Sequence, residues 1–317
     1  MQALVPVGRA AGLVAMAEVP SPEPRPDEAL VRVQAFSVNR GEIFRLENPE
    51  PGARPGKDVA GVVVRAAADG TGPAAGQRVI GHPEAGGWAE YAAVPAGSLA
   101  VLPPEVTVVQ GAALPLAGLT ALRLLRAAGG VSGRRILLTG ASGGVGHYVT
   151  ELAAAAGAKV TAVTSSAERG QRLAELGAAE IVRDVAGASG PFDLALESTG
   201  GAALAAAVDL LAAGGTLIWF GQASRTPATL DFFTILGGPQ TVTIRSFAYW
   251  DAPGGYGPDL ATLVRLVATG SLHPEIGRVA GWADTAATLT DLYQRRIRGN
   301  AVLTVGTGWQ SRGERPS

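Results

Sequence analysis

The feature that most constrains the fold of this 317-residue chain is a glycine-rich segment between a strand and a helix. An apolar strand is expected at residues 136–139, and it runs into Gly140-Ala141-Ser142-Gly143-Gly144-Val145-Gly146. A helical pattern follows at 148–156, and a second apolar strand follows at 160–163. A strand, a tight turn, a helix and another strand form the unit of a parallel sheet, so the segment predicts an α/β fold.

The same alternation continues to residue 244. Strands are expected at 136–139, 160–163, 180–182, 193–197, 216–220 and 241–244. Helices lie between most of them, and 168–176 is a second clear example. The strands are too apolar to have a face in water, which is typical of a sheet covered on both faces. We therefore predict a doubly wound parallel sheet.

Residues 1–110 have a different pattern. Short β-rich runs alternate there with segments rich in proline and glycine, and they fall at 29–36, 59–65, 77–80 and 88–94. A helix is expected at 117–128, a further helix at 284–296 and a closing strand at 301–305. Because a chain of this length commonly holds two domains, we predict a β-rich domain beside the parallel-sheet domain.

The composition excludes several classes of function. The net charge is −1, with 26 Lys and Arg against 27 Asp and Glu, which offers no basic field for nucleic acid or an anionic membrane. The chain has no cysteine, and its three histidines lie far apart, so we expect no disulfide, thiolate nucleophile or metal site. No uncharged apolar run reaches the roughly 18 residues of a membrane span. The N-terminus lacks a signal-peptide pattern, so a cytoplasmic location is the default expectation.

The glycine-rich segment is suited to binding a dinucleotide. Glycines allow the backbone to approach a pyrophosphate, and the helix that follows presents free N–H groups to the phosphates. We predict that Gly140, Ser142, Gly143, Gly144, Val145 and Gly146 bind the cofactor. The spacing departs from the plain GxGxxG pattern, so a glycine turn without a ligand is the alternative.

The end of the second strand indicates which cofactor binds. An NAD site places an acid there to accept hydrogen bonds from the ribose hydroxyls. This strand ends in Val163-Thr164-Ser165-Ser166-Ala167, without an acid, and Arg169 follows. Hydroxyls and a cation suit a 2′-phosphate, so we predict NADPH, held by Ser165, Ser166 and Arg169. The alternative is that Arg169 is an ordinary solvated helix residue.

Further segments occur in a recognisable order. They are Val31-Arg32-Val33-Gln34-Ala35 with Asn39, Pro55-Gly56-Lys57-Asp58-Val59-Ala60-Gly61-Val62-Val63, Gly76-Gln77-Arg78-Val79-Ile80-Gly81, Gly86-Gly87-Trp88-Ala89-Glu90-Tyr91, and Ala112-Ala113-Leu114-Pro115 with Gly118-Leu119-Thr120-Ala121. In this order the chain resembles the medium-chain dehydrogenase/reductase superfamily and, within it, the zinc-free quinone oxidoreductase branch. The resemblance covers nearly the whole chain.

The resemblance implies a domain organisation and an oligomeric state. A GroES-like catalytic domain would cover 1–115 and be completed by 251–317, with a Rossmann domain at 116–250 inserted. Members often form homodimers through the edge of the Rossmann sheet, which here is the strand near 241–246. The zinc branch binds catalytic zinc through cysteine and histidine, but this chain has Lys57 in place of that histidine. Catalytic zinc is therefore not expected.

The resemblance also suggests residues at the site. Asn39 would contact the nicotinamide ribose or a substrate oxygen, Thr120 the nicotinamide region, and Arg295 a cofactor phosphate. Gly221 and Gln222 follow the fifth parallel strand, at the edge where ligands bind in open α/β sheets. The alternatives are structural: a turn-forming Asn39, a packing Thr120 and a surface Arg295.

Without zinc, hydride transfer favours an acceptor that is already electrophilic, so we predict a quinone or an activated alkene such as an enone as substrate. An enoyl reductase tailoring a polyketide or related metabolite is the first alternative. An NADPH-binding sensor or structural protein with little catalysis is the second. The proton donor stays open, because Phe44 stands where the branch often has Tyr. Glu42 is a candidate donor or a structural acid. His82 is expected to be a surface loop residue, and the alternative is a catalytic residue in a loop that faces the cleft.

Overall fold

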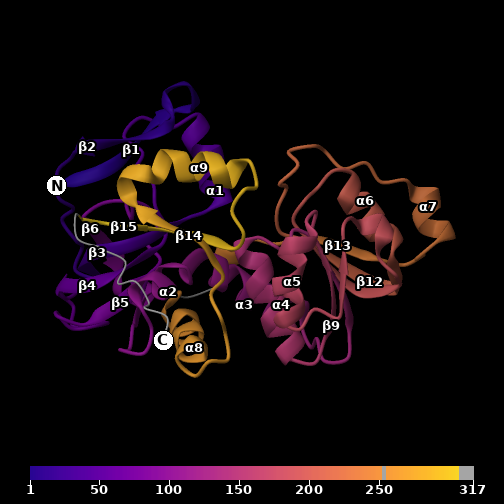
Figure 1. Cartoon of the computed structure of the whole chain (residues 1–317). Coiled ribbons are helices and arrows are strands. Elements are labelled where there is room, and N and C mark those ends of the chain that lie inside the picture. The colour runs from indigo at the N-terminus through magenta and orange to yellow at the C-terminus, as the bar shows by residue number, and fades with distance from the viewer. Residues whose placement is uncertain (252–254, 307–317) are drawn as a thin grey trace, which may run out of the picture. The chain divides into compact units, whose positions relative to one another are not determined.

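The computed structural model describes residues 1–251 and 255–306, and contacts divide them into two compact units (Figure 1). The first unit holds the described residues of Met1–Leu116, Gly254–Ser271 and Ile276–Ser317. The second unit holds those of Ala117–Pro253 and Leu272–Glu275. The short piece 272–275, which the sequence analysis assigned to the first domain, thus packs with the second unit. The division into a GroES-like and a Rossmann domain at 115/116 and 250/251 stays a prediction.

The second unit is built on a six-stranded sheet whose strands all run parallel. Its strands are β8 (Arg135–Leu138), β9 (Lys159–Val163), β10 (Glu180–Val182), β11 (Phe192–Glu197), β12 (Leu211–Trp219) and β13 (Thr243–Ser246). Their spatial order is β10-β9-β8-β11-β12-β13. The chain extends the sheet from β8 in one direction and from β11 in the other, so the strand order reverses between them. The predicted doubly wound sheet is confirmed.

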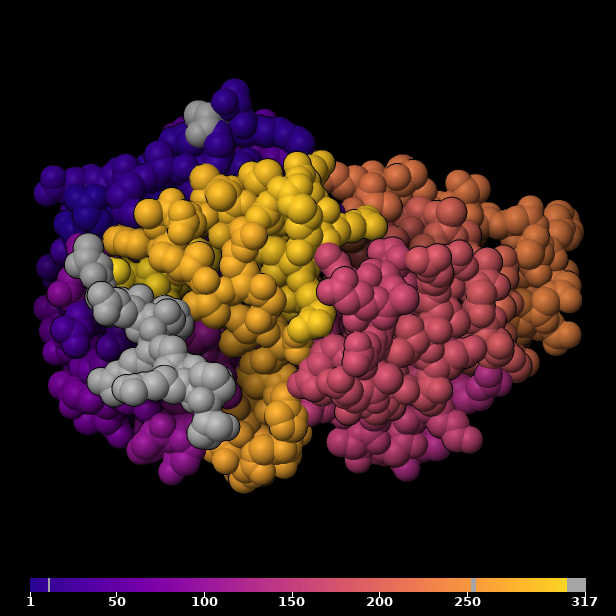
Figure 2. Space-filling view, viewed as in Figure 1, coloured from indigo at the N-terminus to yellow at the C-terminus, as the bar shows by residue number. Residues whose placement is uncertain are grey.

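The helices that follow the first part of the chain are α3 (Pro115–Ala128), α4 (Gly144–Ala155), α5 (Ala167–Glu175), α6 (Ala202–Asp209) and α7 (Phe232–Gly237). Helix α4 packs on β9, α5 on β10 and α6 on β11 and β12, whereas α7 packs on α6. Helix α4 begins four residues before the predicted start, because three of the intervening residues have low helix propensity and hide the boundary. Helix α7 has no buried residue, and its segment, orange in the space-filling view, lies at the surface (Figure 2).

The first unit is built on a mainly antiparallel seven-stranded sheet with the order β14-β15-β3-β4-β5-β7, and β6 also pairs with β3. Its strands are β3 (Glu28–Val38), β4 (Val59–Arg65), β5 (Arg78–Gly81), β6 (Tyr91–Pro95), β7 (Leu99–Val101), β14 (Ile276–Gly281) and β15 (Asn300–Thr304). Strand β15 pairs with β3 in the register Ala301↔Val38, so the chain's last strand completes the sheet of its first part. A separate hairpin pairs β1 (Gln2–Gly8) with β2 (Leu13–Glu18).

The α-helices in the described residues of this unit are α1 (Arg40–Glu47), α2 (Val108–Ala112), α8 (Gly257–Ala268) and α9 (Thr285–Tyr293). Helix α9 packs against α1, as Figure 1 also shows. No helix in the described part of the chain is both long and apolar enough to cross a membrane.

Trp88 anchors the core of the first unit. Its side chain is fully buried, and its ring stacks on Phe36 with 5.6 Å between the ring centroids. The indole Nε1 donates a hydrogen bond of 3.1 Å to the Ser37 carbonyl. Gly56 makes room for it, because a Cβ at this residue, whose φ is +107°, would lie 2.4 Å from the Trp88 backbone nitrogen. This packing holds the C-terminal end of β3 in place, next to the polar side chains of Ser37 and Asn39.

Candidate functional site

In the second unit, the predicted cofactor loop follows β8 at the carboxyl edge of the sheet. Thr139 Oγ1 donates to Glu197 Oε1 at 2.9 Å and accepts from the Ser198 backbone N–H at 2.9 Å. Ser198 Oγ in turn donates to the Thr139 carbonyl at 3.1 Å. The end of β8 is therefore joined to the loop after β11. In an open α/β sheet, this switch point is where ligands bind.

Close packing requires two of the glycines in the loop, Gly140 and Gly146. Gly140 has φ +63°, and a Cβ on it would lie 2.6 Å from Ser198 Oγ. A Cβ on Gly146 would lie 2.4 Å from the Ala141 carbonyl oxygen. Gly143 is the N-cap of α4 and brings no side chain to the helix start. The first N–H groups of an α-helix have no partner inside the helix, so the start of α4 is a place where an anion could accept hydrogen bonds.

The turn after β9 fits the ribose end of a nucleotide. Ser166 caps α5, with its Oγ 3.5 Å from the Arg169 backbone nitrogen, and residues 164–167 contain no acid, the first one being Glu168 in the first turn of α5. Thr164 is 5% exposed, and its Oγ1 has no hydrogen-bond partner among the described residues. A buried hydroxyl without a partner is a group that a ligand could satisfy. The sequence analysis did not include Thr164, because a threonine at a strand end gives no distinctive signal.

Gly221 and Gln222 lie beside the same edge. A Cβ on Gly221 would be 3.1 Å from the Ser198 carbonyl oxygen, and Gln222 would be the nearest contact of a Cβ on Gly200. The structure thus brings together the loops after β8, β11 and β12. It adds Ser198 and Gly200, which the sequence analysis missed.

Glu197 stabilises the loops at this edge of the sheet through buried hydrogen bonds. Its side chain is fully buried and accepts hydrogen bonds from Thr139 Oγ1 at 2.9 Å, the Thr199 N–H at 2.7 Å and the Gly200 N–H at 2.9 Å. Burial raises the pKa of the Glu197 carboxyl, although these hydrogen bonds act in the opposite direction. An acid ending an apolar strand was the available signal in the sequence.

In the first unit, five polar residues meet where β3, α1, β4 and β5 approach one another: Ser37, Asn39, Glu42, Asp58 and His82, here called the Asn39 cluster. Asp58 is fully buried at its centre. It accepts hydrogen bonds from Ser37 Oγ, from Asn39 Nδ2 at 2.7 Å and from the Leu116 N–H at 2.9 Å. Asn39, the residue carried over from the resemblance, is the N-cap of α1 and also lies beside these buried polar side chains, and its role at the site stays a prediction.

Glu42 has the strongest electrostatic perturbation of the cluster. It is 7% exposed, and its Oε2 accepts from the Asn39 backbone N–H at 2.9 Å. Burial, followed by the charge of Asp58, raises the pKa of Glu42 from 4.5 to about 8. The pKa of the neighbouring Lys57 is lowered, first by burial and then by Arg45. A carboxyl that keeps its proton near neutral pH is a feature of functional sites.

The expectation for His82 was wrong. The residue is 3% exposed, its Nδ1 lies 3.4 Å from Asp58 Oδ1, and its ring meets Tyr256 edge-on at 4.8 Å between centroids. Its backbone N–H also donates to the Ser98 carbonyl at 3.0 Å, which continues the pairing of β5 beyond Gly81. Strand pairing therefore buries a histidine that the sequence places in a loop.

The remaining predicted residues lie elsewhere in the two units. Thr120 is 7% exposed within α3 in the second unit. Arg295 follows α9 in the first unit and has φ +59°, which is uncommon for a residue other than glycine. The predicted cofactor contacts of both residues stay predictions.

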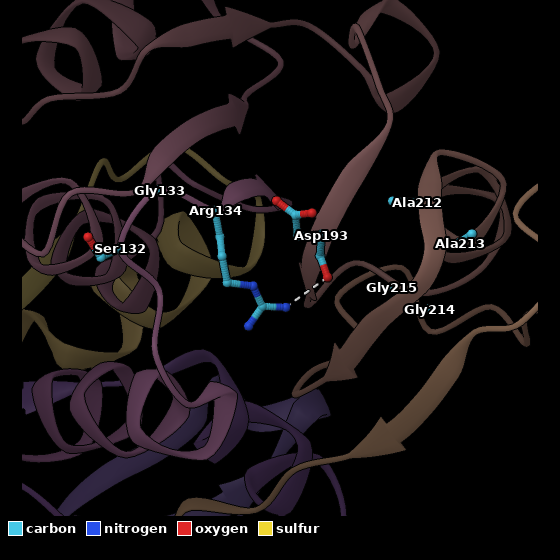
Figure 3. Close-up of a pocket in the computed structure, with 8 residues that line it drawn as sticks. All are labelled: Ser132, Gly133, Arg134, Asp193, Ala212, Ala213, Gly214 and Gly215. Atoms are coloured by element: carbon cyan, nitrogen blue, oxygen red, sulfur yellow. Dashed lines mark hydrogen bonds between the residues drawn. The ribbon is translucent and has the colours of Figure 1, made fainter.

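Two cavities lie away from all of these residues. One of about 460 Å³ is at the amino edge of the parallel sheet, lined by Ser132, Gly133, Arg134, Asp193 and 212–215 (Figure 3). Arg134 closes one side of it by donating to the Asp193 carbonyl at 2.8 Å. The other, of about 750 Å³, lies between α8 and β7. Neither is lined by a predicted site residue, and the amino edge is not where ligands bind in such sheets.

Two family models match the chain. The alcohol dehydrogenase GroES-like domain matches residues 25–104, and the zinc-binding dehydrogenase model matches residues 144–268. The chain belongs to the medium-chain dehydrogenase/reductase superfamily. Its relatives place it in the quinone-oxidoreductase-like branch of that superfamily.

Two relatives and one solved structure show how this superfamily member compares. A quinone-oxidoreductase homologue of spinach chloroplasts is 37% identical over 181 residues, covering 52% of this chain and 55% of that protein. The spectinabilin polyketide synthase system protein NorB of Streptomyces orinoci is 32% identical over 300 residues, covering 91% of this chain and 14% of NorB. The chain thus spans about half or less of these relatives. A mycobacterial protein complexed with NADPH is 25% identical with a TM-score of 0.84, covering 96% of this chain and all of that one.

One matched model is named for zinc, but the residues that bind zinc in this superfamily are not present. The chain has no cysteine, and Lys57 replaces the histidine of the zinc branch. Within residues 1–251 and 255–306, no group of three or more His, Cys, Asp or Glu side chains is placed to hold a metal ion.

Proposed function

We propose that the chain is a zinc-independent, NADPH-dependent reductase that transfers hydride to a quinone or an activated alkene. The observation that carries this proposal is the carboxyl edge of the parallel sheet. There, a glycine loop that tolerates no side chain at Gly140 or Gly146 lies beside a hydroxyl-rich turn without an acid. Relatives named as quinone oxidoreductases, and the mycobacterial protein complexed with NADPH, support it.

Different residues would bind different parts of the cofactor. The loop from Gly140 to Gly146 and the start of α4 would hold the pyrophosphate through backbone N–H groups. Thr164, Ser165, Ser166 and Arg169 would hold the 2′-phosphate, which is the basis for NADPH over NADH. Gly221 and Gln222 would line the same edge, and Thr120 and Arg295 would add further cofactor contacts. The bound cofactor supplies the hydride, and the chain supplies position and electrostatics.

The acceptor follows from the residues available to activate it. Lys57, Asn39 and Glu42 offer hydrogen bonds and one cation, and these polarise a carbonyl less than a metal ion does. A quinone or an enone needs less activation, since hydride adds to a conjugated position and the charge moves to an oxygen. Asn39 is proposed to lie against that oxygen or against the nicotinamide ribose.

An enoyl reductase is the second candidate. The observation that favours it is the match to NorB, which covers 91% of this chain and belongs to a polyketide synthase system. Alkene reduction requires a proton on the α carbon, so this candidate depends on a proton donor more than quinone reduction does.

The test is consumption of NADPH against NADH with a panel of quinones, 2-enones and enoyl thioesters. Turnover of quinones or enones with NADPH is the expected result. Preference for enoyl thioesters would select the second candidate. Tight NADPH binding without turnover on any acceptor would contradict both and leave a sensor or structural role.

A further inference from the structure

Asn39 is the N-cap of α1 and forms a capping box with Glu42, in which the Asn39 side chain faces the Glu42 backbone N–H. The three hydrogen bonds of the Asn39 side chain among the described residues all use Nδ2 as the donor: to Asp58 Oδ2 at 2.7 Å, Ser37 Oγ at 3.3 Å and Glu42 Oε2 at 3.5 Å. Asn39 is half-buried, whereas all three acceptors are buried. Turning the amide over would bring its carbonyl oxygen against the acceptors, which is repulsive. The acceptors therefore fix Nδ2 toward them, and Oδ1, on the side of the Glu42 N–H, has a second lone pair with which it can accept from a ligand.

Glu42 fixes the backbone of the same residue. Its Oε2 accepts from the Asn39 N–H at 2.9 Å, and the Glu42 N–H donates back to the Asn39 carbonyl at 3.0 Å. The other carboxyl oxygen, Oε1, is buried and has no hydrogen-bond partner within the described residues. A charged carboxylate would be poorly stabilised in this position, and the neutral acid avoids burying that charge.

We propose that Glu42, in its neutral form, is a positioning residue that works with Asp58 to hold the Asn39 amide with Oδ1 toward the ligand. This inference rests on the proposed function, in which Asn39 contacts the substrate or the nicotinamide ribose. It assigns Glu42 a role other than donating a proton to substrate. The raised pKa of Glu42, about 8, agrees with a neutral acid at pH 7.

The charged groups around Glu42 determine what its ionisation would do. Asp58 opposes ionisation of Glu42, and Lys57 favours it. Helix α1 also packs on α9, β1 and β2. The charged side chains on or beside those elements form contacts with groups other than Glu42. Asp291 pairs with Arg278 and Arg296, and Arg9 pairs with Glu47. Arg40 lies over the Tyr293 ring. Ionised Glu42 would compete with Asp58 for Nδ2 and repel it, so the amide would lose its fixed orientation.

The first measurement follows the Asn39 side-chain amide by NMR, which needs no turnover. In ¹⁵N-labelled full-length protein, the Asn39 NH₂ signals are assigned from their loss in Asn39→Ala. We expect them to be protected from exchange with water at pH 7 and to change above about pH 8. In Glu42→Gln, which keeps the acceptor but cannot ionise, that change should disappear. Equal pH responses in wild type and Glu42→Gln would overturn the proposal.

The second measurement is the pH profile of kcat/KM with the best acceptor of the panel. We expect the wild-type value to fall about tenfold for each pH unit above about 8, and the Glu42→Gln value to stay level. Glu50→Gln, an exposed site beyond α1, is the matched control and should behave as wild type. Loss of turnover in folded Glu42→Gln at every pH would overturn the positioning role. If no acceptor is reduced but the NMR response is present, the proposed function fails and the positioning role stands.

Discussion

Arg169 is the residue on which cofactor preference depends. It lies in the first turn of α5, after Ser165 and Ser166, at the strand end that lacks an acid. We expect Arg169→Ala to weaken NADPH binding about tenfold, the loss of roughly one charge-assisted hydrogen bond, and to leave NADH binding nearly unchanged. Fluorescence titration measures both affinities. Arg135→Ala, at the amino end of β8, is the control, and an unchanged NADPH affinity in Arg169→Ala would contradict the 2′-phosphate assignment.

Glu42 makes the stability of the protein depend on pH. Its pKa is raised from 4.5 to about 8 by burial and by Asp58. Between these values the folded chain keeps a proton that the unfolded chain releases, so the free energy of unfolding falls as pH rises through this window. We expect the Tm of wild type to fall relative to Glu42→Gln between about pH 5 and pH 8, and the difference to be constant above about pH 9. A difference that does not vary with pH would show that Glu42 is charged throughout.

Glu197 ties two loops together through buried hydrogen bonds. In Glu197→Gln, the NH₂ group would face the Gly200 N–H from either position, because that N–H donates to both carboxylate oxygens, so two buried donors would meet. We expect a loss of about 1–3 kcal/mol in the free energy of unfolding, measured by urea denaturation. NADPH affinity should fall as well, because Gly140 packs on Ser198. If Glu197→Gln keeps the stability and the NADPH affinity of the wild type, Glu197 does not hold these two loops together.

At the level of secondary-structure elements, the close packing of α4 against the glycine loop is the contact on which cofactor binding is expected to depend. A Cβ on Gly146 would lie 2.4 Å from the Ala141 carbonyl oxygen, so Gly146→Ala must push the helix away from the loop. We expect Gly146→Ala to cost about 1–3 kcal/mol of stability and to lose NADPH binding. Gly41→Ala in α1 is the matched control: no atom lies within 4 Å of its Cβ position, and alanine there should stabilise the protein by up to about 1 kcal/mol. Tolerance of Gly146→Ala would show that α4 can shift freely.

At the scale of the whole molecule, the edge of the parallel sheet supports the predicted homodimer. All four residues of β13 are exposed, and Phe232, Phe233 and Leu236 on α7 are 67%, 77% and 54% exposed. Pairing of edge strands would satisfy the free backbone groups of β13. We expect light scattering to give a dimer for wild type and a monomer for Ile244→Lys, since Ile244 lies on β13. Val101→Lys on β7 of the other sheet is the control, and a monomeric wild type would contradict the prediction.

The sequence by itself determined the features that depend on local pattern. The alternation of apolar strands with helices and the position of the glycine loop predicted the parallel sheet, because backbone turns and periodicity are encoded by neighbouring residues. The absence of cysteine, with Lys57 in place of a histidine, made a zinc-free branch the expectation. Strand boundaries were less accurate: β12 begins at Leu211, five residues before the predicted start, because Ala212 to Gly215 carry no strand signal.

Only the tertiary structure decided which polar residues are buried together. Asn39 reaches Asp58 across 19 residues, and His82 reaches Asp58 across 24, through the pairing of β4 with β3 and β5. Thr139 reaches Glu197 across 58 residues, because β8 and β11 are neighbours at the switch point. Burial and pKa shifts arise from such long-range contacts, and a residue's own position in the chain carries no record of them. That is why the sequence left Glu42 as a candidate donor or a structural acid and placed His82 in a surface loop, whereas the fold buries both of them near Asp58.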